Sequence, residues 1–415
     1  MLRPLATIVM LAALAGAAAV PAAPQSRAAA ASSPAAAAID AALSGAVSRG
    51  DVPGIVAMAV TRTAVVYQGA FGAADAPARR PLAVDAIFRI ASMTKPVTSV
   101  AAMQLVEQHR LALDDPAQKY LPEFTDLKIV ETFDASTGAY TLRPAARTVT
   151  VRQLLTHTSG LGYGFTSATV RDFKPKAGER YAVGPLLFEP GTQWIYGTGI
   201  DWAGKIVEKV SGQPLDQYFR EHIFRPLGMA DTDFSVPDDK AARVGPVHRR
   251  RADGSFESSG NQLRAPVNGG GGLFSTARDY ATFMQTILNG GTRAGVRILS
   301  AESVRVMGEN QIGSVGVRAV KTAQPDFSSD FSFVDDGRDK WGIGFMISTA
   351  GVKGKRSAGS LSWGGIDNTY FWIDQRRGIG GVILMQFLPF ADAKALAAYD
   401  AFERGVYQLT ATASR

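Results

Sequence analysis

The sequence predicts an α/β protein in which one antiparallel sheet is built from both ends of the chain and helices flank it. β-prone runs lie near residues 54–71 and again near 369–387, whereas helical apolar patterns and loops fill the region between them. No internal repeat divides the 415 residues, and 46% of them are hydrophobic, which suits a globular core. We therefore expect one large domain over residues 35–415, with a mostly helical inserted subdomain at about 115–300.

The first 34 residues have the pattern of an export signal and leader. Arg3 provides a short positive start, residues 5–20 are uncharged and apolar, and Val20 and Ala22 are small residues at the positions that signal peptidase reads. The alternative is an uncleaved membrane anchor, but the run is shorter than the roughly 20 residues that usually span a bilayer. We expect cleavage, a periplasmic or secreted protein, and no stable membrane insertion of the mature chain.

The individual elements follow from local patterns. Residues 36–49 form a helical pattern that Gly50 ends. Two β-prone runs at 54–60 and 64–71 flank a short turn, which predicts a hairpin. Further helices are expected at 93–108, 151–155, 201–210, 279–288 and 392–407, and further strands at 369–373 and 380–387.

Composition excludes several kinds of chemistry. The chain has no Cys, so a thiol nucleophile, a disulfide and a thiolate zinc site are all excluded. Its four His residues are too far apart in sequence for the common zinc motifs, and a site made only of carboxylates stays open. The formal charge is +7, but the only dense basic run is residues 248–251 (HRRR) in an expected surface loop. We therefore expect no nucleic-acid partner.

A Ser-x-x-Lys pair stands at the start of the helix expected at 93–108. Pro96 favours the first turn of a helix, so Ser92 and Lys95 lie near its amino end and on one face. A buried Lys can act as a base towards a neighbouring hydroxyl. The spacing also fits a capped helix with a solvated Lys, and it does not decide between the two.

Two glycine-rich segments are further candidates. Tyr196 lies in residues 194–199 (WIYGTG), just before a helix, and Trp363-Gly364-Gly365 precedes a strand-like run. Glycines allow a ligand or another backbone to approach closely. Alternatively, Tyr196 anchors a loop and the two glycines form a turn or bulge.

Together these segments resemble the serine β-lactamase and penicillin-recognising superfamily, in a pattern most similar to class C β-lactamases and family VIII carboxylesterases. The resemblance covers about residues 38–410, and Ser-x-x-Lys is one of its signatures. The supporting motifs are residues 89–96 (RIASMTKP), 104–107 (QLVE), 113–116 (LDDP), 120–122 (YLP), 154–161 (LLTHTSGL) and 269–276 (GGGGLFST). The resemblance implies a β-lactamase-like fold.

The resemblance also implies roles. Ser92 would be the acylated nucleophile, with Lys95 and Tyr196 sharing the base role. The backbone amides of Ser92 and Ile366 would form the oxyanion hole. No metal and no organic cofactor is required for this chemistry. His157 is expected to be structural, holding loop backbone.

Two departures from the family pattern bear on the substrate. Thr198 stands where the family has Asn, and Trp363-Gly364-Gly365 replaces Lys-Thr-Gly, so the cation that grips a substrate carboxylate is missing. Losing such a charge-assisted contact costs roughly 1.5–3 kcal/mol. We therefore expect an exported serine hydrolase that cleaves carboxylic esters, with Trp363, Gly364, Gly365 and Thr198 lining the substrate site. The alternatives are a class C-like β-lactamase, a D-amino-acid peptidase or transesterase, and a non-catalytic binder of cell-wall peptides. The sequence does not predict the oligomeric state.

Overall fold

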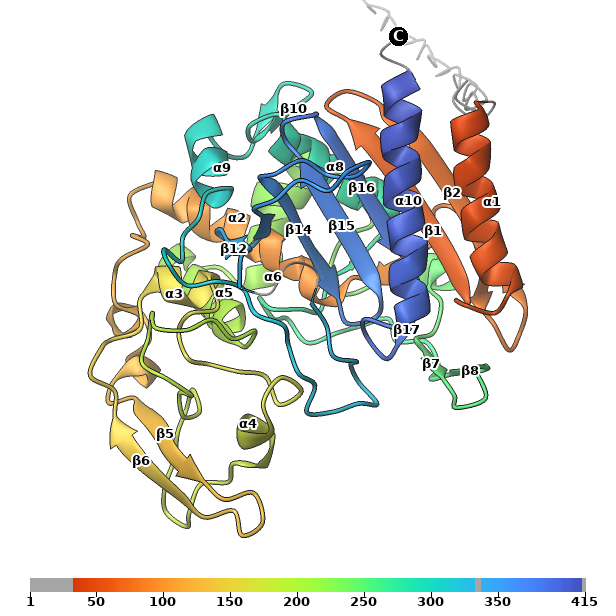
Figure 1. Ribbon diagram of the computed structural model, residues 1–415. Helices are drawn as coiled ribbons and strands as arrows, with labels where there is room; N and C mark the ends of the chain where they lie inside the picture. The colour runs from red at the N-terminus through yellow and green to blue at the C-terminus, as the bar shows by residue number, and fades with distance from the viewer. Residues whose placement is uncertain (1–32, 333–336, 413–415) are drawn as a thin grey trace, which may run out of the picture.

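An eight-stranded antiparallel sheet forms the centre of the protein (Figure 1). The computed structural model describes residues 33–332 and 337–412. In spatial order the strands run β12-β13-β14-β15-β16-β1-β2-β3, so strands from the two ends of the chain share one sheet. Their bounds are β1 (Gly54–Thr61), β2 (Val65–Asp75), β3 (Arg80–Pro81), β12 (Lys340–Trp341), β13 (Met346–Ser348), β14 (Ser360–Gly365), β15 (Thr369–Asp374) and β16 (Ile379–Leu384). The predicted fold class is confirmed.

The β1–β16 pair joins the two ends of the chain. Val56 lies opposite Leu384, and the antiparallel register continues to Thr61 opposite Ile379. All of β1 except Thr61 is buried, and all of β16 is buried. A strand covered on both faces reads as a continuous apolar run rather than an alternating one, and both segments have that pattern.

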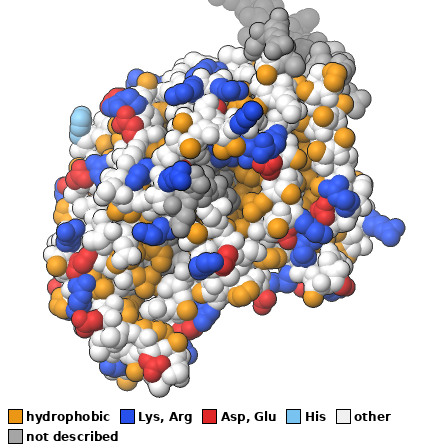
Figure 2. Space-filling model, in the orientation of Figure 1, with side chains coloured by type: hydrophobic (Ala, Val, Ile, Leu, Met, Phe, Trp, Pro, Cys, Tyr) orange, Lys and Arg blue, Asp and Glu red, His pale blue; other side chains and the backbone are white. Residues whose placement is uncertain are grey.

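Helices cover both faces of the sheet. On one face α1 (Pro34–Ser48) packs beside α10 (Ala393–Thr412), and in Figure 1 both lie in front of the strands. On the other face α8 (Ala277–Leu288) packs on β1 and β16, with α2 (Thr94–Glu107) nearby. Figure 2 shows acidic and basic side chains interspersed over the visible face of the molecule.

Each predicted helix is present. Residues 36–49 correspond to α1, which Ser33 caps by accepting a hydrogen bond from the Ala36 amide at 3.1 Å. The predicted leader thus overlaps the described chain only at Ser33 and Pro34. Residues 93–108, 279–288 and 392–407 correspond to α2, α8 and α10.

The middle of the chain holds short helices, 3₁₀ turns and irregular segments. Its helical elements are η3 (Ala117–Lys119), η4 (Pro122–Phe124), α3 (Val151–Leu155), α4 (Ala168–Asp172), α5 (Gly199–Ser211), α6 (Leu215–Phe219), η5 (Arg220–Phe224), α7 (Arg225–Leu227) and η6 (Asp238–Arg243). α3 and α5 were predicted. The hairpin of β5 (Lys128–Phe133) and β6 (Tyr140–Pro144) was not. The remaining short elements are β4 (Phe88–Arg89) paired with β9 (Phe274–Ser275), β10 (Thr292–Arg293) paired with β11 (Val296–Arg297), and α9 (Ala301–Met307).

The local structure differs from the sequence interpretation at three places. The basic run expected in a surface loop instead begins with β7 (His248–Arg250), which pairs with β8 (Phe256–Ser258) and with β17 (Phe387–Leu388). His248 is buried, and Arg250 forms an ion pair with Asp392 at 2.7 Å, so this run is largely neutralised and packed. The segment containing Trp363 precedes the strand β15, as expected, but is itself part of β14. The strand expected over 380–387 is divided into β16 and β17.

No helix within residues 33–332 and 337–412 has the length and apolarity to cross a membrane.

Candidate active site

Ser92 lies in a tight turn immediately before α2. The turn is a short 3₁₀ helix, η2 (Ala91–Met93), and Ala91 takes a φ of 42° there. A non-glycine residue in this left-handed region is strained, and such strain is common at functional sites. The Ile90 amide donates to the Leu273 carbonyl at 2.9 Å, which ties the turn to the segment before α8. Ser92 is thereby presented partly exposed at the amino end of the helix.

Lys95 is fully buried and its amine lies against Ser92. Its Nζ is 3.2 Å from Ser92 Oγ, 3.0 Å from the Tyr163 hydroxyl and 2.6 Å from the Gly270 carbonyl oxygen. The side chain has 0% relative exposure, so water does not compete for these contacts. Ser92 and Lys95 therefore have the arrangement that Ser-x-x-Lys predicted: one face of a helix start, within hydrogen-bond distance.

Tyr196 lies beside Lys95, but its hydroxyl is directed elsewhere. The Lys95 amine sits 4.8 Å from the centroid of the Tyr196 ring, a cation–π contact. The Tyr196 hydroxyl oxygen accepts a hydrogen bond from the Trp363 indole Nε1 at 3.3 Å. Thr198 is two residues further on, partly exposed at the start of α5. The structure thus brings Ser92, Lys95, Tyr196 and Trp363 together, with the ring of Tyr196 rather than its hydroxyl facing the amine.

β14 approaches the nucleophile turn closely through its glycines. A Cβ on Gly365 would overlap the Ile90 carbonyl oxygen, so only glycine fits there. This contact places the backbone that follows Gly365, beginning with the Ile366 amide, beside the turn that carries Ser92. Arg89 and Asp367 flank the same junction, with Arg89 Nε 3.6 Å from Asp367 Oδ2.

Tyr163 and Asp201 are site residues that the sequence interpretation missed. Tyr163 donates to Asp201 Oδ2 at 2.6 Å and lies against Lys95. Burial, the Asp201 charge and the neighbouring Tyr196 raise the pKa of Tyr163 well above 10. The available signals were that Tyr163 closely follows the 154–161 motif and that Asp201 lies in the first turn of α5.

His157 makes the loop contact expected of it. Its Nδ1 accepts from the Gly197 amide at 3.4 Å, and its carbonyl accepts from the Ile195 amide at 3.0 Å. Burial and the nearby Lys95 amine lower the pKa of His157 well below 6.5. A neutral imidazole packed among Trp194, Tyr196 and Trp341 therefore supports the loop that carries Tyr196.

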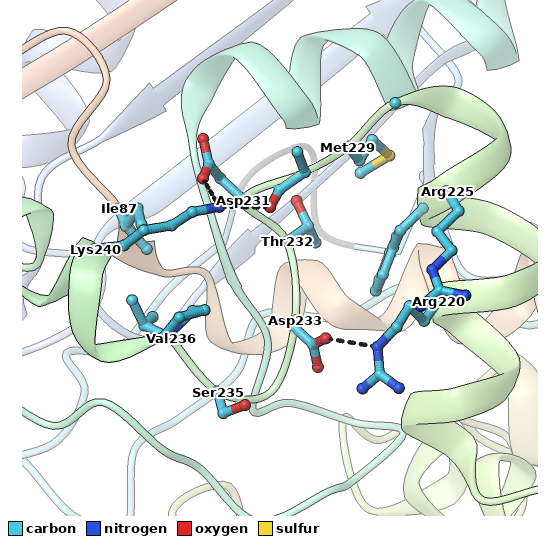
Figure 3. Close-up of a pocket in the computed structure, with 14 residues that line it drawn as sticks. Ile87, Arg220, Arg225, Met229, Asp231, Thr232, Asp233, Ser235, Val236 and Lys240 are labelled. Atoms are coloured by element: carbon cyan, nitrogen blue, oxygen red, sulfur yellow. Dashed lines mark hydrogen bonds and ion pairs between the residues drawn. The ribbon is translucent and has the colours of Figure 1, made fainter. Parts of the chain in front are cut away.

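A separate cavity of about 450 Å³ lies between α7 and the loop before η6, and none of Ser92, Lys95, Tyr163 or Tyr196 lines it (Figure 3). Four of the five charged side chains that line it form ion pairs with one another, Arg220 with Asp233 at 3.0 Å and Lys240 with Asp231 at 2.8 Å, and Arg225 is the fifth. Because these groups satisfy each other, the cavity offers a ligand little charge, and the Ser92 cluster is the candidate active site.

Comparisons with known proteins agree with this geometry. The Beta-lactamase family model matches residues 39–404. Acyltransferase mokF from Monascus pilosus is 32% identical over 361 residues, covering 80% of this chain and 85% of that protein. Lovastatin esterase from Penicillium rubens is 29% identical over 384 residues, covering 86% and 95%. A mutant of simvastatin synthase from Aspergillus terreus superimposes with a TM-score of 0.76 at 30% identity, covering 91% and 98%. The chain therefore belongs to the β-lactamase family and is an enzyme of its serine hydrolase and acyltransferase branch.

Proposed function

We propose that the protein cleaves carboxylic esters through an acyl-enzyme on Ser92. The observation that carries the proposal is the contact between the fully buried Lys95 amine and Ser92 Oγ at 3.2 Å. Ser92 Oγ attacks the ester carbonyl while its proton passes to Lys95 Nζ. The amides of Ser92 and Ile366 are assigned to the oxyanion that forms.

Collapse of the tetrahedral intermediate completes acylation. The bond from the carbonyl carbon to the alcohol oxygen breaks, and Lys95 returns the proton to the departing alkoxide. Water then attacks the acyl carbon and passes a proton to Lys95. The bond from that carbon to Ser92 Oγ breaks, and Lys95 returns the proton to Oγ, which releases the acid and regenerates Ser92. Tyr196 faces the Lys95 amine with its ring and its oxygen accepts from the Trp363 indole, so we assign it a supporting role beside Lys95 rather than a direct proton transfer.

The rings of Trp341, Trp363 and Tyr196 form an aromatic wall beside the site, and this wall favours a neutral substrate over an anionic one. Trp363 is buried, and its ring lies 4.7 Å from the Trp341 ring and 4.9 Å from the Tyr196 ring. Its indole N–H is used by Tyr196, so this position supplies no cation for a substrate carboxylate. An ester with uncharged acyl and alcohol groups suits this wall better than a β-lactam or a peptide with a free carboxylate.

Acyl transfer to an alcohol is a second candidate. Two of the similar proteins are named for synthesis or acyl transfer and one for ester cleavage. Hydrolysis and acyl transfer would both proceed through the Ser92 acyl-enzyme and differ only in whether water or an alcohol attacks it. Adding a primary alcohol during turnover and measuring the new ester separates transfer from hydrolysis.

The test is a substrate panel on the purified protein. We expect turnover of p-nitrophenyl acetate and butyrate, its loss in Ser92→Ala, and little or no turnover of nitrocefin or a D-Ala-D-Ala peptide. Ser99→Ala is the matched control, because Ser99 is a buried serine of the same helix with no hydrogen-bond partner among the described residues. Equal ester turnover in Ser92→Ala would refute the proposal, and a stable acyl adduct without turnover would indicate a binding protein instead.

Export is part of the proposal. It rests on the sequence of residues 1–34. Expression of the full chain in a Gram-negative host, followed by fractionation and amino-terminal sequencing, should give a periplasmic protein that begins after Ala22. A full-length cytoplasmic product would contradict it.

A further inference from the structure

Tyr163 and Asp201 form a hydrogen-bonded chain that ends on the Lys95 amine. Asp201 Oδ2 accepts a hydrogen bond from the Tyr163 hydroxyl at 2.6 Å, and the Tyr163 oxygen is 3.0 Å from Lys95 Nζ. Tyr163 comes from the loop after α3 and Asp201 from the first turn of α5, so two separate segments supply the chain. Neither residue contacts Ser92 through a hydrogen bond within the described part of the structure.

The chemistry of the partners determines which atom donates at each contact of Lys95. The Gly270 carbonyl can only accept. The Tyr163 hydroxyl donates a hydrogen bond to Asp201 and stays protonated, because its pKa is raised well above 10. Its oxygen therefore accepts from Lys95. Two of the three positions around Nζ must therefore carry N–H groups. Of the three partners, only Ser92 Oγ is placed to donate to Lys95 when the amine is neutral and to accept from it when it is an ammonium.

We infer that Tyr163 and Asp201 are positioning residues: Asp201 orients the Tyr163 hydroxyl, whose oxygen accepts one N–H of Lys95 while the Gly270 carbonyl accepts a second. The third position on Nζ, which carries either the lone pair or an N–H, is thereby directed at Ser92. This inference rests on the proposed function. When Lys95 is neutral, the lone pair faces the Ser92 hydroxyl and receives its proton as Oγ bonds to the carbonyl carbon. When Lys95 is an ammonium, the third N–H faces Oγ and the proton passes from there to the leaving alkoxide.

The charge of Asp201 adds to this orientation. The ammonium that forms during acylation is buried, and a buried cation is costly unless polar groups compensate it. Asp201 provides a negative charge one hydroxyl away, and the rings of Tyr163 and Tyr196 lie 5.1 and 4.8 Å from the amine.

Because Gly270 has no side chain, it leaves room for the hydrogen bonds between Lys95, Tyr163 and Asp201. A Cβ at this position would lie 2.7 Å from the Tyr163 hydroxyl and would overlap the Asp201 carboxylate. Glycine at 270 thus lets its own carbonyl reach Lys95 while Tyr163 and Asp201 pack against its Cα. This gives a physical reason for one glycine of the 269–272 run.

The test compares Tyr163→Phe and Asp201→Asn in two backgrounds, native and Lys95→Met. The first measurement is kcat and KM for p-nitrophenyl butyrate. The second is the second-order rate constant for labelling of Ser92 by a fluorophosphonate. In that reaction the Oγ–P bond forms, the P–F bond breaks with loss of fluoride, and Lys95 takes the Ser92 proton. Tyr407→Phe is the matched control, because Tyr407 also donates to a buried carboxylate, Asp374 at 2.8 Å, far from Ser92 in the fold. Thermal unfolding identifies variants that fail to fold, and Asp201→Asn preserves side-chain shape if Tyr163→Phe does not fold.

In the native background we expect each variant to lower kcat and the labelling rate about ten- to a hundredfold, the usual effect of losing one charge-assisted hydrogen bond. KM should stay within about threefold, because substrate binding does not use these side chains. In the Lys95→Met background each variant should cost less than about twofold more, because both residues act through Lys95.

Equal losses in both backgrounds, or native rates in the folded variants, would overturn the inference. The labelling rate keeps this test separate from the proposed function. A wild-type protein that is labelled at Ser92 but hydrolyses no ester refutes the proposed substrate and still tests the role of Tyr163 and Asp201.

Discussion

The carboxyl group of Asp367, one residue after the proposed oxyanion-hole amide, should make the stability of the protein depend on pH. Asp367 is 1% exposed, and its Oδ2 has no hydrogen-bond partner among the described residues. Burial raises the pKa of Asp367 from 3.8 to about 6, and the opposing effect of Arg89 at 3.6 Å is too small to reverse this. The folded protein therefore holds this proton more tightly than the unfolded chain does.

The sign and size of the effect follow from that difference. Stability from the protonated carboxyl is fully present below about pH 4 and is lost as the pH rises through about 6. A shift of about two pH units corresponds to about 3 kcal/mol in the free energy of unfolding. In Asp367→Asn the side chain stays neutral, so this component disappears.

Denaturant unfolding of wild type and Asp367→Asn between pH 4 and pH 8 measures the effect. Relative to wild type, the variant should gain up to about 3 kcal/mol across this range. Asp374→Asn is the opposite control. Burial acts to raise the pKa of Asp374, but hydrogen bonds from the Arg377 and Ser357 amides and from Tyr407 outweigh it and lower that pKa. The stabilising effect of this carboxylate is already complete above about pH 4, so the Asp374→Asn curve should run parallel to that of wild type over most of this range and differ in slope only at lower pH. Parallel stability curves for wild type and Asp367→Asn would refute the reasoning.

Three further substitutions test other parts of the structure. Gly270→Ala forces the Asp201 carboxylate to move, so kcat should fall at least about tenfold with little change in KM, and steady-state kinetics on an ester would show it. Trp363→Lys should lower kcat/KM for neutral esters and raise it for an ester with a free carboxylate, by about tenfold each way; an unchanged ratio would contradict the proposed role of this wall. Glu403→Leu leaves the buried Arg356 without its partner, which lies 2.8 Å away, and should destabilise the protein by about 3–5 kcal/mol in denaturant titration while leaving kcat near wild type at low temperature.

The parts of the site that could be predicted are those encoded over short stretches of sequence. Ser92 and Lys95 are three residues apart, so helix geometry alone places them together. Tyr163 could not be found in this way, because its partner Lys95 is 68 residues away and its own neighbourhood has no helix or strand pattern that points to an amine. Only the folded arrangement of α2, α5 and the loop after α3 creates that contact.

The errors in secondary structure have a similar origin. Residues 248–251 carry three arginines, and such a run is typical of a solvated loop. Tertiary partners override this tendency, because Arg250 pairs with Asp392 and His248 accepts a hydrogen bond from the Ala76 amide at 3.0 Å. β14 was not predicted because glycines have low strand propensity, and its strand structure depends on pairing with β15 and β13.

The two tyrosines at the site divide the tasks that one tyrosine was expected to perform. Tyr163 faces the buried side of Lys95 and, through Asp201, fixes which way the amine donates. Tyr196 offers its ring to the amine, and Trp363 holds its oxygen with a neutral N–H in the place where the resemblance implies a cation. Trp363 thus removes the cation that would grip a substrate carboxylate and gives the Tyr196 oxygen a neutral donor, while Lys95 has its own partners in Tyr163 and Gly270.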